Sequence, residues 1–110
     1  MEDLTLKVCI ACEGDVPPLS SEEANQLLVQ VPLWKISEDE KELTREYSFK
    51  DFKEALAFTN KIGEVAEAEG HHPDLTLGWG KVGVSLTTHA IGGLSENDFI
   101  VASKVEALFG

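Results

Sequence analysis

Basic side chains are scarce in this sequence. Its 110 residues include 20 acidic and only 9 basic side chains, which gives a formal net charge of -11. Lys and Arg supply most of the attraction to nucleic acids and to acidic membrane surfaces. We therefore expect no direct binding to nucleic acid and no attachment to an acidic membrane.

Long apolar runs are also missing. A helix that spans a bilayer needs roughly 18 or more consecutive apolar residues, and no stretch approaches that length. The opening residues, from Met1 to Thr5, lack the basic start and apolar middle of a secretory signal. We expect no membrane segment and a cytoplasmic location.

Cysteine is limited to Cys9 and Cys12. A structural zinc site normally has four ligands, and there is no second Cys-x-x-Cys pair. A thioredoxin-like redox pair needs a helix N-terminus, whereas residues 13–18 have the pattern of an acidic loop. We interpret the pair as two reduced cysteines in an N-terminal arm. A metal site that borrows histidines, or a redox role, stays open as the alternative.

The chain is long enough for one hydrophobic core but not for two. We expect a single domain over residues 1–110, in which residues 1–19 form an extended arm. A helix and two strands should follow this arm. Ser20 and Glu23 have the spacing of a capping box, and apolar residues recur at helical spacing until Pro32. Short strand patterns at 34–37 and 43–49 predict a hairpin.

The second half of the chain repeats this order. Asp51 opens a long helix of about five turns. Strand patterns at 75–79 and 82–86 predict a second hairpin, and Ser95 begins a last helix with Asp98 at the capping-box position. The sequence therefore predicts an α+β fold of order α-β-β-α-β-β-α, a four-stranded antiparallel sheet with helices packed on one face. The open edges of such a sheet favour edge-to-edge dimerisation.

The three histidines of the chain are His71, His72 and His89. The first two directly follow a predicted helix stop at Gly70, and Pro73 prevents the helix from resuming. His89 ends the later strand, so a hairpin can return it to the same corner. We expect the three imidazoles, which titrate near neutral pH, to share one pocket.

Two kinds of chemistry suit such a cluster. Metal binding is one, but adjacent histidines point in diverging directions and there is no His-x-x-x-His pair. Proton transfer without a metal is the other, in which one imidazole takes a proton while another gives one. The second needs fewer assumptions.

Three neighbours of the cluster have structural as well as functional interpretations. Glu67 is either a solvated helix residue or, four positions before His71, its partner. Asp98 serves as a helix cap by itself. Trp79 is either a core or turn residue or an aromatic platform for a flat heterocycle.

Together these residues resemble the pterin-4a-carbinolamine dehydratase family, and the similarity covers nearly the whole chain. The matching motifs are Glu67-x-x-x-His71-His72-Pro73, Trp79, Thr88-His89, Gly93-Leu94-Ser95-Glu96-x-Asp98 and Phe49-Lys50-Asp51-Phe52. The Cys-x-x-Cys pair followed by Pro17-Pro18-Leu19-Ser20 is similar to the longer microbial and plant-type members.

The resemblance implies an α+β fold and dimers or tetramers formed partly by joining sheets. It implies a 4a-hydroxytetrahydrobiopterin dehydratase, a lyase that converts a 4a-hydroxytetrahydropterin to quinonoid dihydropterin and water. This reaction recycles the tetrahydropterin used by aromatic amino acid hydroxylases. It implies no cofactor and no metal. The alternative on the same fold is a non-catalytic dimeric interaction module, either a transcriptional cofactor or an assembly factor.

The resemblance also implies residue roles. His71 and His89 would be the acid/base histidines, and His72 would hold the pterin and assist proton transfer. Glu67 would orient an imidazole or contact the pterin, and Asp98 would fix His89 or the substrate. The residues expected to bind the substrate are Glu67, Pro73, Trp79, Thr88 and Asp98.

Overall fold

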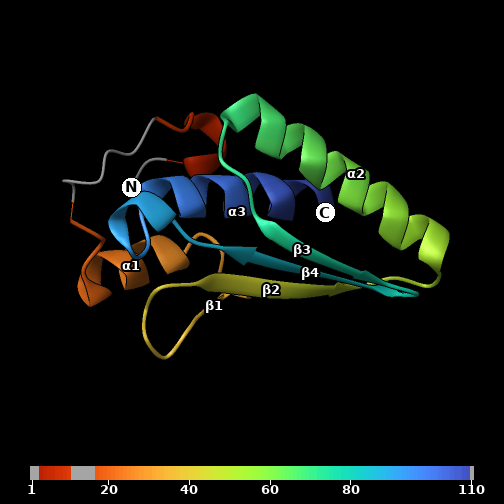
Figure 1. Cartoon of the computed structure of the whole chain (residues 1–110), viewed down its shortest axis with the longest axis horizontal. Coiled ribbons are helices and arrows are strands. Elements are labelled where there is room, and N and C mark those ends of the chain that lie inside the picture. Colours follow the sequence, from red (N-terminus) through yellow and green to blue (C-terminus); the bar gives the residue numbers. More distant parts are fainter. Residues whose placement is uncertain (1–2, 11–16, 110) are drawn as a thin grey trace.

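The computed structural model of the chain describes residues 3–10 and 17–109 (Figure 1). Within these ranges the order of α-helices and strands is the predicted one. The elements are the 3-10 turn η1 (Leu4–Leu6), helix α1 (Ser21–Leu28), strands β1 (Lys35–Ile36) and β2 (Leu43–Ser48), helix α2 (Phe52–Glu69), strands β3 (Asp74–Gly78) and β4 (Lys81–Leu86), the 3-10 turn η2 (His89–Ile91) and helix α3 (Glu96–Phe109).

The four strands form one antiparallel sheet in the order β1-β2-β4-β3. Both predicted hairpins, β1 with β2 and β3 with β4, are present. The hairpins join through β2 and β4, which pair from Leu43 opposite Leu86 to Ser48 opposite Lys81. The shorter strands β1 and β3 therefore lie at the two edges of the sheet.

One face of the sheet is covered by helices and the other is open. Side chains alternate between the faces along each strand, so Leu43 and Tyr47 of β2 and Val82, Val84 and Leu86 of β4 all lie in the core. Figure 1 shows α2 and α3 on the same side of the sheet. The predicted fold class, with helices on one face, is confirmed.

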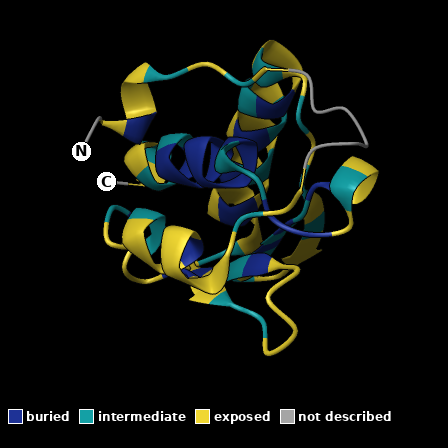
Figure 2. Cartoon of the chain, turned by 90° about the vertical axis from the view of Figure 1, so that its left-hand side faces the viewer, coloured by how far each residue is buried: buried dark blue, intermediate teal, exposed yellow. Residues whose placement is uncertain are grey.

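Helix α3 is the centre of the core. Its consecutive residues Phe99, Ile100, Val101 and Ala102 are all buried, which is typical of a helix surrounded by other elements rather than one with a single apolar stripe. Figure 2 shows the buried residues gathered in the middle of the molecule. None of the helices in the described ranges is both long and apolar enough to cross a membrane.

Part of the described N-terminal segment is not extended as the sequence predicts. Residues Leu4–Leu6 form a 3-10 turn, capped by the side chain of Asp3. Leu4 is buried in the core, and its N–H donates to the side-chain oxygen of Gln30 at 2.9 Å. The apolar Leu4 drives this docking because α3 offers it an apolar surface, which a pattern of single residues does not reveal.

Two predicted element boundaries also move. The capping box of Ser20 and Glu23 is present, but α1 ends at Leu28 because tight turns with bonds to the third residue back carry the chain on to Trp34. Strand β3 ends at Gly78, which leaves Trp79 in the exposed turn to β4.

A network around Glu106 ties the sheet to α3. Its Oε1 accepts hydrogen bonds from Trp34 Nε1 at 3.0 Å, from the Tyr47 hydroxyl at 2.7 Å and from the Arg45 guanidinium. Burial of Glu106 opposes ionisation, but these donors outweigh it and lower its pKa. The charge of Arg45, on the helix-covered face of β2, is thereby balanced.

Candidate active site

Two paired strands bring the three histidines together. His71 and His72 lie between α2 and β3, and His89 begins η2 after β4. Because Asp74 of β3 pairs with Ser85 of β4, the chain entering β3 and the chain leaving β4 meet at the same end of the sheet.

The end of α2 sets the position of His71. Gly70 has a φ of 66°, in the left-handed region that glycine adopts without steric cost. The N–H groups of Gly70 and His71 both donate to the carbonyl of Ala66, at 2.9 and 3.3 Å. Pro73 then blocks any return to helix. His71 is therefore fixed against the last turn of α2.

A cavity of about 510 Å³ has all three histidines in its lining. The expectation that His71, His72 and His89 share one pocket is confirmed. Thr88 lines the same cavity, which has the volume of a typical small-ligand site.

His71 is held by a buried carboxylate. Its Nε2 lies 2.6 Å from Oδ1 of Asp98, whose side chain is fully buried. The other oxygen, Oδ2, accepts from the Thr88 hydroxyl at 2.8 Å and from the Ser95 N–H at 2.9 Å. An ionised carboxylate only accepts hydrogen bonds, which assigns the ring proton of His71 to Nε2. In the neutral imidazole, Nδ1 is then free of a proton and can accept one.

His72 has a carboxylate partner of a different kind. Its Nε2 lies 2.5 Å from Oε2 of Glu67, but the two side chains are 59% and 79% exposed. Glu67, expected to orient an imidazole, thus lies beside His72 rather than His71. A pair so open to water contributes little to stability.

His89 is exposed at the start of η2 and supplies the third imidazole. The preceding Thr88 is buried and forms an isolated β-bridge with Gly93, in which the Thr88 N–H donates to the Gly93 carbonyl at 2.9 Å. This bridge closes the loop that carries His89. Asp98, which the family resemblance assigns to His89 or the substrate, bonds to His71 instead.

Of the five expected substrate-binding residues, only Thr88 is part of the cavity lining. Trp79 sits in the β3–β4 turn, at the opposite end of the hairpin from the histidines, and is 71% exposed. Pro73 lies at the corner before β3 but is not part of the cavity lining. Within one copy of the chain, the structure brings Glu67, Thr88 and Asp98 to the histidines, but not Trp79.

Sequence reasoning missed seven residues of the cavity wall, three of which, Gly70, Thr87 and Ala90, directly adjoin a histidine or Thr88. Cys9 and Ile10 of the N-terminal segment line it, together with Glu69 at the end of α2 and Asn97 in the first turn of α3. The only sequence signal for them was position, since Glu69 is two residues before His71 and Asn97 directly precedes Asp98.

The environment of Cys9 opposes thiol chemistry. Burial and the neighbouring carboxylate of Glu69 raise the pKa of the Cys9 thiol to about 12, so it stays protonated at neutral pH. Cys12 lies outside the described residues. Across residues 3–10 and 17–109, no group of three His, Cys, Asp or Glu side chains is placed to hold a metal ion.

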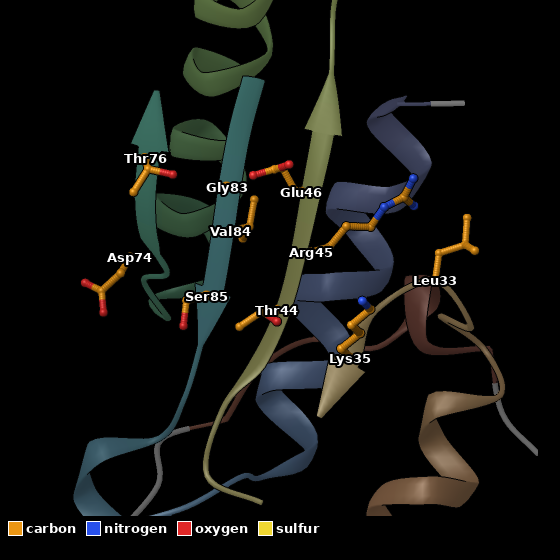
Figure 3. A pocket seen from close by; sticks show the side chains of 10 residues that line it. All are labelled: Leu33, Lys35, Thr44, Arg45, Glu46, Asp74, Thr76, Gly83, Val84 and Ser85. Atoms are coloured by element: carbon orange, nitrogen blue, oxygen red, sulfur yellow. The ribbon is translucent and has the colours of Figure 1, made fainter. Parts of the chain in front are cut away.

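A second hollow, of about 570 Å³, lies on the open face of the sheet (Figure 3). Short and polar side chains dominate its floor, among them Thr44, Thr76 and Ser85. Its lining contains none of the three histidines.

Fold and cavity together define a class of protein: a small α+β domain whose histidine pocket is suited to acid/base chemistry. Comparison with known proteins narrows this class. The model of the family described as pterin 4 alpha carbinolamine dehydratase matches residues 17–108. The chain belongs to this family.

Individual relatives agree. A protein of Methylococcus capsulatus, named provisionally as a pterin-4-alpha-carbinolamine dehydratase, is 52% identical over 105 residues, covering 96% of this chain and 92% of that protein. The crystal structure of a transcriptional coactivator/pterin dehydratase from Brucella melitensis has a TM-score of 0.80 at 32% identity, covering 84% of this chain and 99% of that one. A pterin dehydratase-like RuBisCO assembly factor of the alpha-carboxysome shares the fold, with a TM-score of 0.62, 24% identity and coverage of 70% of this chain and 89% of that one.

Proposed function

We propose that this protein is a 4a-hydroxytetrahydropterin dehydratase that acts by histidine acid/base catalysis. The observation that carries the proposal is the gathering of His71, His72 and His89 around one cavity, with His71 bonded to the buried Asp98. The family of the chain supplies the substrate class.

The reaction requires two proton transfers and no change of oxidation state. The proton on N5 of the pterin must leave, and the departing 4a-hydroxyl must gain a proton. The C4a–O bond breaks, a C4a=N5 double bond forms, and the products are quinonoid dihydropterin and one water. Because no electrons are gained or lost overall, the reaction needs no redox cofactor, and the two proton transfers can be carried out by imidazoles alone.

His71 is suited to the role of base. The Asp98 carboxylate holds the proton on Nε2, so Nδ1 can take the N5 proton, and the same carboxylate stabilises the imidazolium that forms. His89 then acts as the acid that protonates the leaving hydroxyl. Well-placed groups of this kind contribute about 10² to 10⁴ each in rate.

His72 and Glu67 are assigned to binding. His72 lines the cavity, and its exposed pair with Glu67 can hold the pterin by hydrogen bonds while the other two histidines move protons. Thr88 contributes through its bond to Asp98, and Pro73 through the rigid corner it forms. Trp79 has no role in this proposal, since the hairpin places it at the other end of the sheet.

The experiment that tests the proposal is a stopped-flow assay of 4a-hydroxytetrahydropterin dehydration. The double variant His71→Ala/His89→Ala should lose the rate enhancement while its circular dichroism spectrum stays near that of the wild type; its unfolding midpoint should fall, because the buried Asp98 loses a partner, but the protein should stay folded under assay conditions. Trp79→Ala serves as the matched control and should keep its rate. A double variant as fast as the wild type would reject the assignment.

We further propose a homodimer or homotetramer that works in the cytoplasm in tetrahydropterin recycling. Strands β1 and β3 are the edges of the sheet, and unpaired edges favour pairing with a second copy. The acidic composition supports a partner other than nucleic acid.

One observation favours a second function. The Brucella melitensis relative is named both a transcriptional coactivator and a pterin dehydratase, which associates this fold with protein partners. On α2 of this chain, Phe52 and Leu56 are 44% and 41% exposed, one turn apart, as a protein-binding helix would present them. An interaction module would keep its partner after loss of the histidines, whereas the dehydratase would lose its activity.

A further inference from the structure

The N-terminal segment forms part of the histidine cavity although it lies outside the family match. The match begins at residue 17, whereas Cys9 and Ile10 line the cavity beside His71 and His89. This wall therefore lies outside the residues that the family model matches.

The side chains of Glu69 and Asn97 form hydrogen bonds with the backbone of this segment, Glu69 with Cys9 and Asn97 with Ile10. Oε1 of Glu69 accepts from the Cys9 N–H at 2.8 Å, and Oε2 accepts from Lys104 Nζ at 2.6 Å. The Glu69 side chain is 10% exposed, and the bonds from Lys104 and Cys9 lower its pKa, which keeps it charged at neutral pH. Hydrogen bonds to such a carboxylate are the stronger kind.

Asn97 forms two hydrogen bonds with the backbone of Ile10, one as acceptor and one as donor. The Ile10 N–H donates to Oδ1 of Asn97 at 3.2 Å, and Nδ2 of Asn97 donates to the Ile10 carbonyl at 2.5 Å. The side-chain amide thus makes the same pair of hydrogen bonds with Ile10 that a backbone amide of a neighbouring strand would make. Asn97 is buried, so its amide is held in place by α3.

The same two elements hold the acid/base pair. Glu69 precedes His71 by two residues at the end of α2, and Asn97 directly precedes Asp98 on α3. The distance between the arm and the His71–Asp98 pair is therefore set by neighbouring residues on rigid helices. Cys9 and Ile10 line the same cavity as His71.

We propose that Cys9 and Ile10 form a substrate-contacting wall of the cavity, and that Glu69 and Asn97 are positioning residues that hold this wall against the pterin. The inference rests on the proposed function and extends it. The arm supplies binding energy and excludes water, while the histidines move protons. Loss of the hydrogen bonds from Glu69 or Asn97 to this segment should then weaken pterin binding and leave the rate of the chemical step unchanged.

The test uses the full chain with Asn97→Ala and Ile10→Pro. Asn97→Ala removes both hydrogen bonds between the Asn97 amide and the backbone of Ile10. Ile10→Pro removes the backbone N–H that donates to Asn97. It should not disturb the core, since Ile10 is 74% exposed. Fluorescence titration with oxidised biopterin gives a dissociation constant independent of turnover. Both variants should bind the probe about tenfold more weakly and show a KM about tenfold higher. Their kcat and its pH profile should match the wild type.

The matched control is Glu96→Gln. It weakens the ion pair with Lys7, 2.9 Å long, which holds the same segment outside the cavity lining. This variant should bind biopterin as the wild type does. If Asn97→Ala does not fold, Ile10→Pro decides the matter alone.

Three outcomes are decisive. Wild-type affinity and KM in Ile10→Pro would overturn the role of the arm while leaving the dehydratase assignment intact. A lower kcat at unchanged probe affinity would also overturn it, because the arm would then act on the chemistry. A wild-type protein that neither binds biopterin nor dehydrates the substrate would remove both proposals.

Discussion

At the scale of single residues, the two histidine–carboxylate pairs have similar lengths and different surroundings. The His71–Asp98 pair has 14% and 0% of its side chains exposed, against 59% and 79% for His72–Glu67. Water screens the second pair and competes for its atoms, whereas the first lies where a fixed charge acts strongly. Only the buried pair can hold an imidazole in one orientation and one tautomer.

Replacing each carboxylate by its amide separates the two pairs. Asp98→Asn keeps the shape but replaces one oxygen by an N–H donor, so the tautomer of His71 is no longer enforced. We expect kcat to fall by about 10²-fold. Glu67→Gln should change kcat by less than about threefold, with any effect in KM. Steady-state dehydration kinetics measure both.

Unfolding midpoints in urea serve as the control for Asp98→Asn, because a buried substitution can act through stability. A variant that unfolds like the wild type but turns over slowly supports the positioning role. Equal losses of kcat in Asp98→Asn and Glu67→Gln would contradict it.

The histidine cluster could be predicted from sequence, but its partners could not. His71, His72 and His89 were placed together because a helix stop and a hairpin are local features with strong residue signals. The partner of Asp98 depends on where α3 docks beside α2, which no local pattern specifies. The assignment of Asp98 to His89 or the substrate rested on resemblance, and the structure pairs it with His71.

At the scale of elements, two glycines of α2 have opposite environments. Gly63 lies inside the helix with open space where a Cβ would stand. Gly70 ends the helix in a left-handed conformation, with a φ of 66°. Alanine favours a helix interior and is strained at a positive φ.

Alanine at these two positions should therefore shift stability in opposite directions. Gly63→Ala should raise the free energy of unfolding by about 1 kcal/mol. Gly70→Ala should lower it by about 1 kcal/mol and reduce kcat, because His71 follows directly. Urea unfolding and dehydration rates measure the two effects. A destabilised Gly63→Ala would indicate that another copy of the chain covers this face of α2.

Local pairing was predictable and long-range pairing was not. Both hairpins follow from alternating patterns joined by short turns. The contact of β2 with β4 joins residues about 40 apart along the chain. No local sequence signal indicates that Leu43 pairs with Leu86. The helical turn at Leu4–Leu6 escaped prediction because three residues carry no periodicity.

At the scale of the whole molecule, charged contacts between elements hold the layers together. Glu106 of α3 bonds to the β2 residues Arg45 and Tyr47, and Glu69 of α2 bonds to Lys104 of α3. The pKa values of both carboxyl groups are lowered in the folded protein. Acid also lowers the repulsion that comes from the net charge of -11, so a test of these specific contacts needs an exposed carboxylate as its control.

Acid should weaken the fold through these carboxylates. A group whose folded pKa is lowered contributes stability above its unfolded pKa, close to 4.5 for Glu, and loses it as the pH falls through the folded pKa. Glu106→Gln cannot ionise and should be less stable by about 2 kcal/mol at pH 7. Below pH 4.5 the wild type loses this advantage, so the two stability curves should converge. Urea midpoints at pH 7, about 4.5 and about 3 measure this, with the exposed Glu64→Gln as control. Curves for wild type and Glu106→Gln that stay parallel down to the lowest pH would show that the Glu106 network is not the acid-sensitive link between the sheet and α3.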